Sequence, residues 1–158
     1  MKLDELLSTS YKYETQDEDD TTRVAEFTTE DGSKIIMKFG YWESPEYWEI
    51  DFRRDDKIEL TGGGDAPRIL GTVVKILQEF LRDEKPKFFG FSANKKEASR
   101  VSVYKRIMKR ILPSSGYVDA ANRLDQLDHK IAPGFLKNKI KAFPSGEQMM
   151  FARKDMFL

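Results

Sequence analysis

The pattern of apolar residues changes at Gly62, Gly63 and Gly64, and this change constrains the fold more than any other feature of the chain. Before the glycines, between residues 22 and 52, apolar and polar residues alternate, as in strands with one buried face. After them, apolar residues recur at spacings of three and four from Ala66 to Leu81, as in a helix with one buried face. This order predicts a sheet followed by a helix that packs on it.

Two features organise the predicted sheet. Asp31-Gly32 stands between two apolar runs and predicts a hairpin, because glycine accepts the positive φ of tight hairpin turns. Residues 47–52 alternate strictly and predict a half-buried strand with one polar face, and residues 87–93 read as a buried central strand. A helix between these two strands would be a crossover that makes them parallel neighbours.

The remaining segments are assigned by composition and spacing. A second helix is predicted to start near Asn94 and to stop at Pro113 and Gly116, followed by a polar, weakly helical stretch over residues 117–140. Residues 14–20 are predicted to form an exposed acidic loop, and residues 147–155 a closing strand. Leu3, Leu6 and Leu7 lie on one side of a predicted short helix within residues 1–13.

The 158 residues suffice for one domain with one core. We therefore expect a short N-terminal helix over residues 1–13 and a single α/β (α+β) domain over residues 22–158. Its sheet should be mixed but mostly antiparallel, with two main helices.

Composition excludes several classes of site. The chain has no cysteine and one histidine, His129, so we expect no disulfide, no metal site and no Ser-His-Asp triad. No apolar run approaches the ~20 residues of a membrane span, and the N-terminus lacks the pattern of a signal peptide. We therefore expect no membrane partner, and an origin in the cytoplasm or in a compartment filled from the cytoplasm.

Charge is unevenly distributed along a chain whose net charge is zero. Residues 1–65 hold 18 acidic and 8 basic side chains, a balance of −10, and residues 66–158 hold 9 and 19, a balance of +10. The second predicted helix is especially basic, with Glu97 as its one acid. Three interpretations stay open for this face: contact with nucleic-acid phosphates, a solvated surface, or pairing with the acidic half. The basic residues are Lys95, Lys96, Arg100, Lys105, Arg106, Lys109 and Arg110.

The segment "FFGFSANKKEASRVSVYKRI", together with the glycine loop "TGGGDA", resembles the GNAT superfamily of N-acetyltransferases. The resemblance covers about residues 22–116. It implies a GNAT-like fold in which acetyl-CoA lies between two splayed parallel strands, with its pyrophosphate on backbone N–H groups at a helix start. It also implies Tyr104 as the acid that protonates the departing thiolate, and Glu49 or Asp51 as the base. The implied cofactor-binding residues are Gly62, Gly63, Gly64, Ala66 and Asn94.

Two residues of the loop depart from the family pattern. Thr61 stands where the family has Gln or Arg, and Asp65 places a carboxylate where two phosphates would arrive. As the residue before a helix, Asp65 instead suits a cap. These departures favour a protein that has this fold but does not transfer an acetyl group. We therefore expect no cofactor. Acetyl-CoA is expected only if the chain is an enzyme.

The segments "GGGDAPRILGTV" and "FSANKKEASRVSVYKR" are also similar to small proteins of tailed bacteriophages. The expected function is a non-catalytic, virion-associated or host-interaction binding module with a protein partner, located in the host cytoplasm or the virion. The alternatives are an acetyl-CoA-dependent N-acetyltransferase and, more weakly, a nucleic-acid-binding protein.

Overall fold

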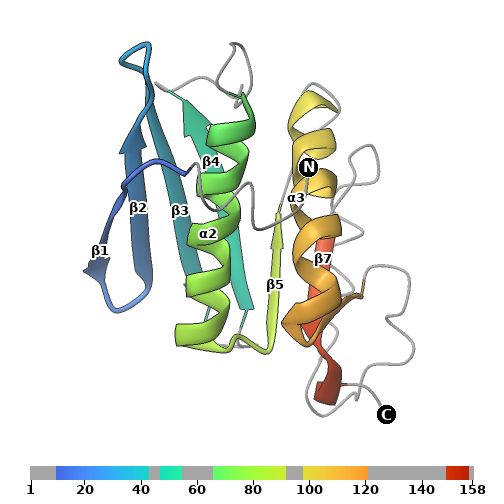
Figure 1. Cartoon of the computed structure of the whole chain (residues 1–158). Helices are drawn as coiled ribbons and strands as arrows, with labels where there is room; N and C mark the ends of the chain where they lie inside the picture. The colour runs from blue at the N-terminus through green and yellow to red at the C-terminus, as the bar shows by residue number, and fades with distance from the viewer. Residues whose placement is uncertain (1–9, 43–46, 55–65, 92–97, 121–148, 157–158) are drawn as a thin grey trace.

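Seven strands form one sheet, and two helices cover one of its faces (Figure 1). The computed structural model describes residues 10–42, 47–54, 66–91, 98–120 and 149–156. Across the sheet the strands follow the order β1-β2-β3-β4-β5-β7-β6. In chain order, with the labels of Figure 1, the elements are β1 (Glu14–Asp19), β2 (Thr22–Thr28), β3 (Lys34–Trp42), β4 (Tyr47–Arg54), α2 (Ala66–Glu84), β5 (Phe88–Phe91), α3 (Ala98–Ser115), β6 (Tyr117–Asp119), β7 (Met149–Arg153) and the 3-10 turn η3 (Lys154–Met156).

The sheet is mixed and mostly antiparallel, as predicted. Five of the six strand pairings in the described part are antiparallel, and β4 with β5 is the parallel one. The helix α2 connects these two parallel strands, which confirms the predicted strand-helix-strand unit. The C-terminal strand β7 is also confirmed, and it lies between β5 and β6 rather than at an edge.

The hairpin predicted at Asp31-Gly32 joins β2 to β3. Gly32 has a φ of 82°, which explains the glycine. The N–H of Gly32 donates to the carbonyl of Thr29 at 3.0 Å, and the N–H of Ser33 donates to the Asp31 carboxylate at 2.9 Å. The turn therefore satisfies its own polar groups and sets the register of the two strands.

The main core lies between the sheet and the two helices. The inward residues of α2 and α3 whose side chains are described recur at the predicted spacing and are all buried. They pack on alternate residues of the central strands. The helices contribute to this core Ile69, Leu70, Val73, Val74, Leu77, Phe80 and Leu81 from α2, and Tyr104, Ile107, Met108 and Ile111 from α3. The strands contribute residues that include Met37, Phe39, Ile50, Phe52, Phe89 and Phe91.

Three sequence predictions for local structure are wrong or incomplete. The acidic run 14–20, predicted to be a loop, is exposed but forms β1 over Glu14–Asp19, because it pairs with β2 along the sheet edge. The helix α3 passes Pro113 and ends at Ser115, since a proline near a helix end removes few intrahelical bonds. Residues 117–119, assigned to a weakly helical stretch, form β6 against β7.

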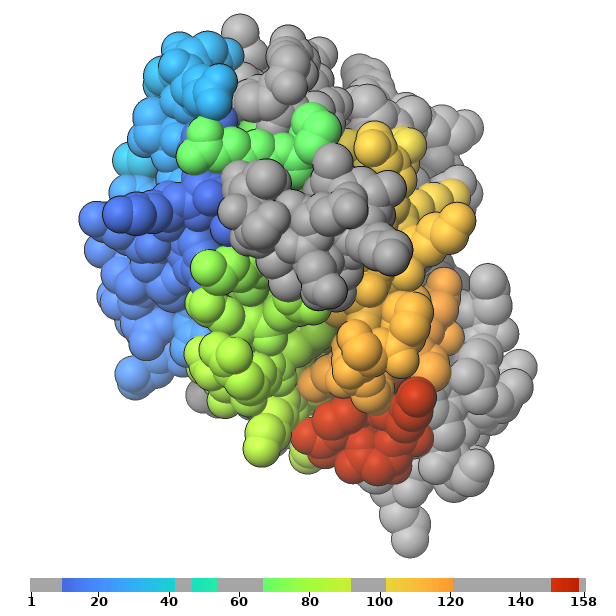
Figure 2. Space-filling model, viewed as in Figure 1, coloured from blue at the N-terminus to red at the C-terminus, as the bar shows by residue number. Residues whose placement is uncertain are grey.

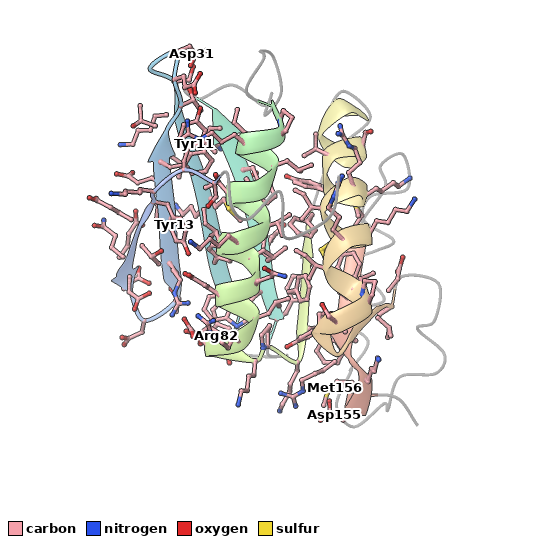
Figure 3. The ribbon with its side chains drawn as sticks, viewed as in Figure 1. Tyr11, Tyr13, Asp31, Arg82, Asp155 and Met156 are labelled. Carbon is pink, nitrogen blue, oxygen red and sulfur yellow. The ribbon has the colours of Figure 1, made fainter. Side chains whose placement is uncertain are left out.

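The predicted N-terminal helix falls mostly on residues 1–9, which lie outside the described residues. Ser10–Tyr13, its last residues, are not helical. They run beside α2, where Figure 3 labels Tyr11 and Tyr13. The ring of Tyr11 stacks on Phe27 with 5.6 Å between ring centroids, and the Arg68 guanidinium lies 3.8 Å from its centroid.

Thr72 fastens this segment to α2 through one fully buried hydroxyl. Its Oγ1 accepts a hydrogen bond from the Tyr11 N–H at 2.7 Å and donates to the Arg68 carbonyl at 2.8 Å. We expect Thr72→Val to cost about 1–3 kcal/mol of unfolding free energy, because the buried N–H of Tyr11 loses its acceptor. Thr72→Ser keeps the hydroxyl and should cost less, and urea unfolding of both variants checks this order. Equal losses in the two variants would contradict the role of the hydroxyl.

Candidate functional site

The candidate site lies where the parallel strands β4 and β5 stop pairing. They pair over three residues, from Trp48–Phe89 to Ile50–Phe91, after which β4 continues to Arg54 while β5 ends at Phe91. The first turns of α2 and α3 lie at this same end of the sheet (Figure 1). Crevices outside the carboxyl ends of parallel strands are the usual ligand sites of such sheets. This end of the sheet is therefore the candidate site for a ligand.

Most of the predicted cofactor-binding residues lie outside the described residues. Gly62, Gly63, Gly64 and Asn94 belong to this group. Ala66 is the first residue of α2, and only its backbone is described. The predicted phosphate contacts of the glycine loop therefore stay a prediction.

Tyr104, the predicted acid, is fully buried in an aromatic cluster at the end of the paired region. Its ring stacks on Phe91 of β5 with 4.5 Å between centroids, and it lies 5.1 Å from the ring of Phe52 on β4. Phe52 and Phe91 also stack on each other at 5.7 Å. None of the three side chains has exposed surface. We call these three residues the ring cluster; it bridges β4 and β5 on the helix-covered face.

The predicted bases lie on the other face of the sheet. Side chains alternate between faces along a strand. Because Phe52 contacts Tyr104 on the helix-covered face, Glu49 and Asp51 point to the opposite face, where both are half-buried. Asp51 also forms an ion pair with Arg53 at 3.0 Å. The sheet thus separates the candidate acid from both candidate bases.

The sheet is closed where β4 and β5 pair. Gly90 lies opposite Glu49 in the register, and the hydroxyl of the fully buried Tyr47 occupies the position that a Cβ of residue 90 would need. The carbonyl of Met149 on β7 lies 2.6 Å from the same position. Only a glycine fits here, so Gly90 lets three strands and a tyrosine pack closely beside the candidate site.

The basic face predicted on the second helix is found on α3. Lys105, Arg106 and Lys109 are exposed and Arg110 is partly exposed. Lys95 and Lys96 lie outside the described residues, and Arg100 is described only as backbone.

Three cations of this face have no ion pair with the acidic half in the described part of the chain; such pairing was one of the open interpretations. Among the described residues, Arg106, Lys109 and Arg110 form no ion pair. The carboxylates of the first half pair instead with other cations, as in Glu26–Lys34, Glu30–Arg68 and Asp17–Arg23. Arg106, Lys109 and Arg110 are therefore cations of α3 without an ion-pair partner in the described part of the chain.

Sequence reasoning missed a cavity of about 630 Å³ at the other end of the sheet, beside the end of α2. Tyr41 and Trp48 line it, with 4.9 Å between their ring centroids. The segment 85–87 forms another wall. Its successive carbonyls accept from Arg153 Nη1 at 2.8 Å, from the Tyr117 hydroxyl at 2.5 Å and from the Arg153 N–H at 3.0 Å. The sequence feature that could have indicated this wall is Pro86, which follows the end of α2.

Burial raises the pKa of Tyr117 to about 12. Its hydroxyl therefore stays protonated at neutral pH and donates to the Pro86 carbonyl. This hydrogen bond helps to hold the cavity wall in place.

Comparison of the chain with protein-family models and with curated proteins finds no match. Within the described ranges, neither α2 nor α3 is long and apolar enough to cross a membrane. The same ranges contain no group of three or more acidic or histidine side chains arranged to hold a metal ion. The assignment of function therefore depends on the geometry of this chain.

Proposed function

We propose that this chain is a bacteriophage protein with a degenerate GNAT-like fold, which acts as a non-catalytic binding module on a virion or host protein. The phage source depends on the sequence similarity described above. The observation that carries the non-catalytic assignment is the ring cluster, in which Tyr104 of α3 packs on Phe52 of β4 and Phe91 of β5 and all three side chains are fully buried.

The strand arrangement supports the GNAT-like part of the proposal. The resemblance implies two parallel strands that splay after a short paired region, with a helix start at their open end. The pairing of β4 with β5 over three residues, and the continuation of β4 alone to Arg54, fit that expectation. The connection through α2 fits it as well.

The packing of the same region argues against catalysis. An acyl thioester that entered between the strands from the helix-covered face would have to displace rings that have no exposed surface. Tyr104 would also have to act with bases that lie across the sheet, one of which is already paired with Arg53. Asp65, which directly precedes α2 in the sequence, adds a carboxylate where the resemblance implies that phosphates would bind.

Thermal unfolding with and without acetyl-CoA tests this proposal. A ligand at 100 times its Kd would stabilise the fold by about 2.7 kcal/mol and raise Tm by several degrees. We expect no change in Tm at millimolar acetyl-CoA. The proposal would be wrong if acetyl-CoA raised Tm by several degrees and the protein showed acetyl transfer that is lost in Tyr104→Phe. The chain would then be an acetyltransferase.

The location of the protein is tested separately. Mass spectrometry of purified phage particles should detect this chain if its partner is a virion protein. Absence from the particles would leave a host protein as the proposed partner, and co-purification from infected cells would then be the relevant measurement.

A further inference from the structure

The outward face of α3 carries cations and no acid. Between Ala98 and Ser115 the helix contains no acidic residue. Arg106 and Arg110 stand four residues apart, and Lys109 stands three residues after Arg106, so their like charges lie side by side on the helix surface. Such pairs destabilise a helix, which makes this face suited to a partner that supplies negative charge.

The strand β1 carries the opposite charge at the edge of the sheet. All six of its residues are exposed, and among the described strands it pairs with β2 alone. Glu14 lies directly opposite Glu26 in the register, an unfavourable pair of like charges. Glu18 and Asp20, the latter just after the strand, form no ion pair within the described part of the chain. We call Glu14, Asp17, Glu18, Asp19 and Asp20 the acidic edge.

The two surfaces cannot neutralise each other within one molecule. The acidic edge lies at one side of the sheet, and α3 covers the region of β5 and β7 near the other side, with α2 between them (Figure 1). Figure 2 shows the same separation on the molecular surface, with β1 in blue and α3 in yellow to orange. The chain as a whole has zero net charge, a state that favours association of a protein with itself.

We propose that the basic face of α3 binds the acidic edge of a second copy of this chain. When two such molecules align with opposite orientation about a two-fold axis, each contact is made twice, as in other symmetric dimers. A nucleic acid is the less suitable occupant, because the carboxylates of the same neutral molecule oppose the approach of a polyanion. This inference is independent of the proposed function.

Light scattering at two ionic strengths tests for the dimer. At about 100 μM protein, which largely populates a dimer with a Kd of about 10 μM, we expect an average mass approaching twice the 18.4 kDa of one chain at about 10 mM salt. At about 1 M salt the Debye length falls to roughly 3 Å, and the mass should return to that of one chain. A monomer at both ionic strengths would overturn the proposal.

Charge reversal tests the two surfaces. Arg106→Glu with Lys109→Glu, and separately Glu18→Lys with Asp20→Lys, should each give a monomer at low salt. An equimolar mixture of the two variants should restore the dimer, because each then offers the charge that the other lacks. This restoration also shows that both variants are folded.

A matched control changes the net charge by the same amount elsewhere. Lys12→Glu with Lys154→Glu, both exposed and outside α3, should leave the dimer intact. Loss of the dimer in this control, or no restoration in the mixture, would show that the contact is not the one proposed. The unchanged protein could instead be a monomer that binds duplex DNA. If Arg106→Glu with Lys109→Glu then abolished DNA binding, α3 would be a nucleic-acid face.

Discussion

We expect Gly90→Ala to lower the free energy of unfolding by about 3 kcal/mol, because the new methyl group has no space. Its Cβ would overlap the hydroxyl of Tyr47 and approach the carbonyl of Met149 to 2.6 Å. Met149 is held in the ladder between β5 and β7, and Tyr47 is fully buried, so neither atom can move freely. The midpoint of urea unfolding should fall while its slope stays unchanged.

Gly40→Ala is the matched control in the same sheet. Gly40 pairs with Glu49, which in turn pairs with Gly90, so the two glycines stand at the same level on β3 and β5, the two strands that flank β4. A Cβ at Gly40 would lie 4.0 Å from the carbonyl of Glu49, an ordinary contact. We expect a change of less than about 0.5 kcal/mol, since glycine is itself unfavourable inside a strand. A small effect at both positions would show that Tyr47 does not pack over Gly90.

Removing the Tyr47 hydroxyl should reduce the cost of the Gly90 substitution. In the double variant Tyr47→Phe with Gly90→Ala, one of the two overlaps is gone while that with the Met149 carbonyl stays. We expect a coupling of about 1 kcal/mol in the double-mutant cycle. Additive effects would place the overlap entirely at the Met149 carbonyl.

The second large effect is expected for Tyr104→Ala, at about 4 kcal/mol of unfolding free energy. The substitution removes a ring that contacts both Phe91 and Phe52 and has no exposed surface, and it leaves a cavity between the strands and α3. Urea unfolding measures the loss. A cost below about 1 kcal/mol would mean that the ring is not part of the core, which would free Tyr104 for catalysis.

Tyr104→Phe separates the ring from its hydroxyl. The ring volume is conserved, so we expect a loss of less than about 1.5 kcal/mol. An exposed residue of the same helix gives the second comparison: Arg106→Ala should change stability by less than about 0.5 kcal/mol. A large loss of stability for Tyr104→Ala, with small losses for Tyr104→Phe and Arg106→Ala, would identify Tyr104 as a residue of the core.

Local chemistry made several parts of the fold predictable. The hairpin at Asp31-Gly32 depends on two turn residues and their immediate neighbours. The inward faces of α2 and α3 depend on spacings that the helix period dictates. The half-buried strand β4 is visible in its alternation. In each case the determining residues are close together in sequence, so the pattern carries enough information.

The strand β1 shows where such patterns fail. Its acidic composition is unfavourable for a strand, yet the hydrogen-bonding groups of β2 offer a partner along the whole edge. The same holds for β6, which is three residues long and depends on β7, some 30 residues further along the chain. Pairing across the sheet overrides local preference in both elements.

The sequence alone determined the class of fold, the helix faces, the central hairpin and the types of residue available for chemistry. The tertiary structure decided where those residues lie. It placed Tyr104 among buried rings with Glu49 and Asp51 across the sheet, and it put the acidic edge and the basic face of α3 on separate sides. The reason is physical: periodicity and turn chemistry act over a few residues, whereas burial, pairing of strands and separation of charge depend on contacts between segments that are distant in sequence.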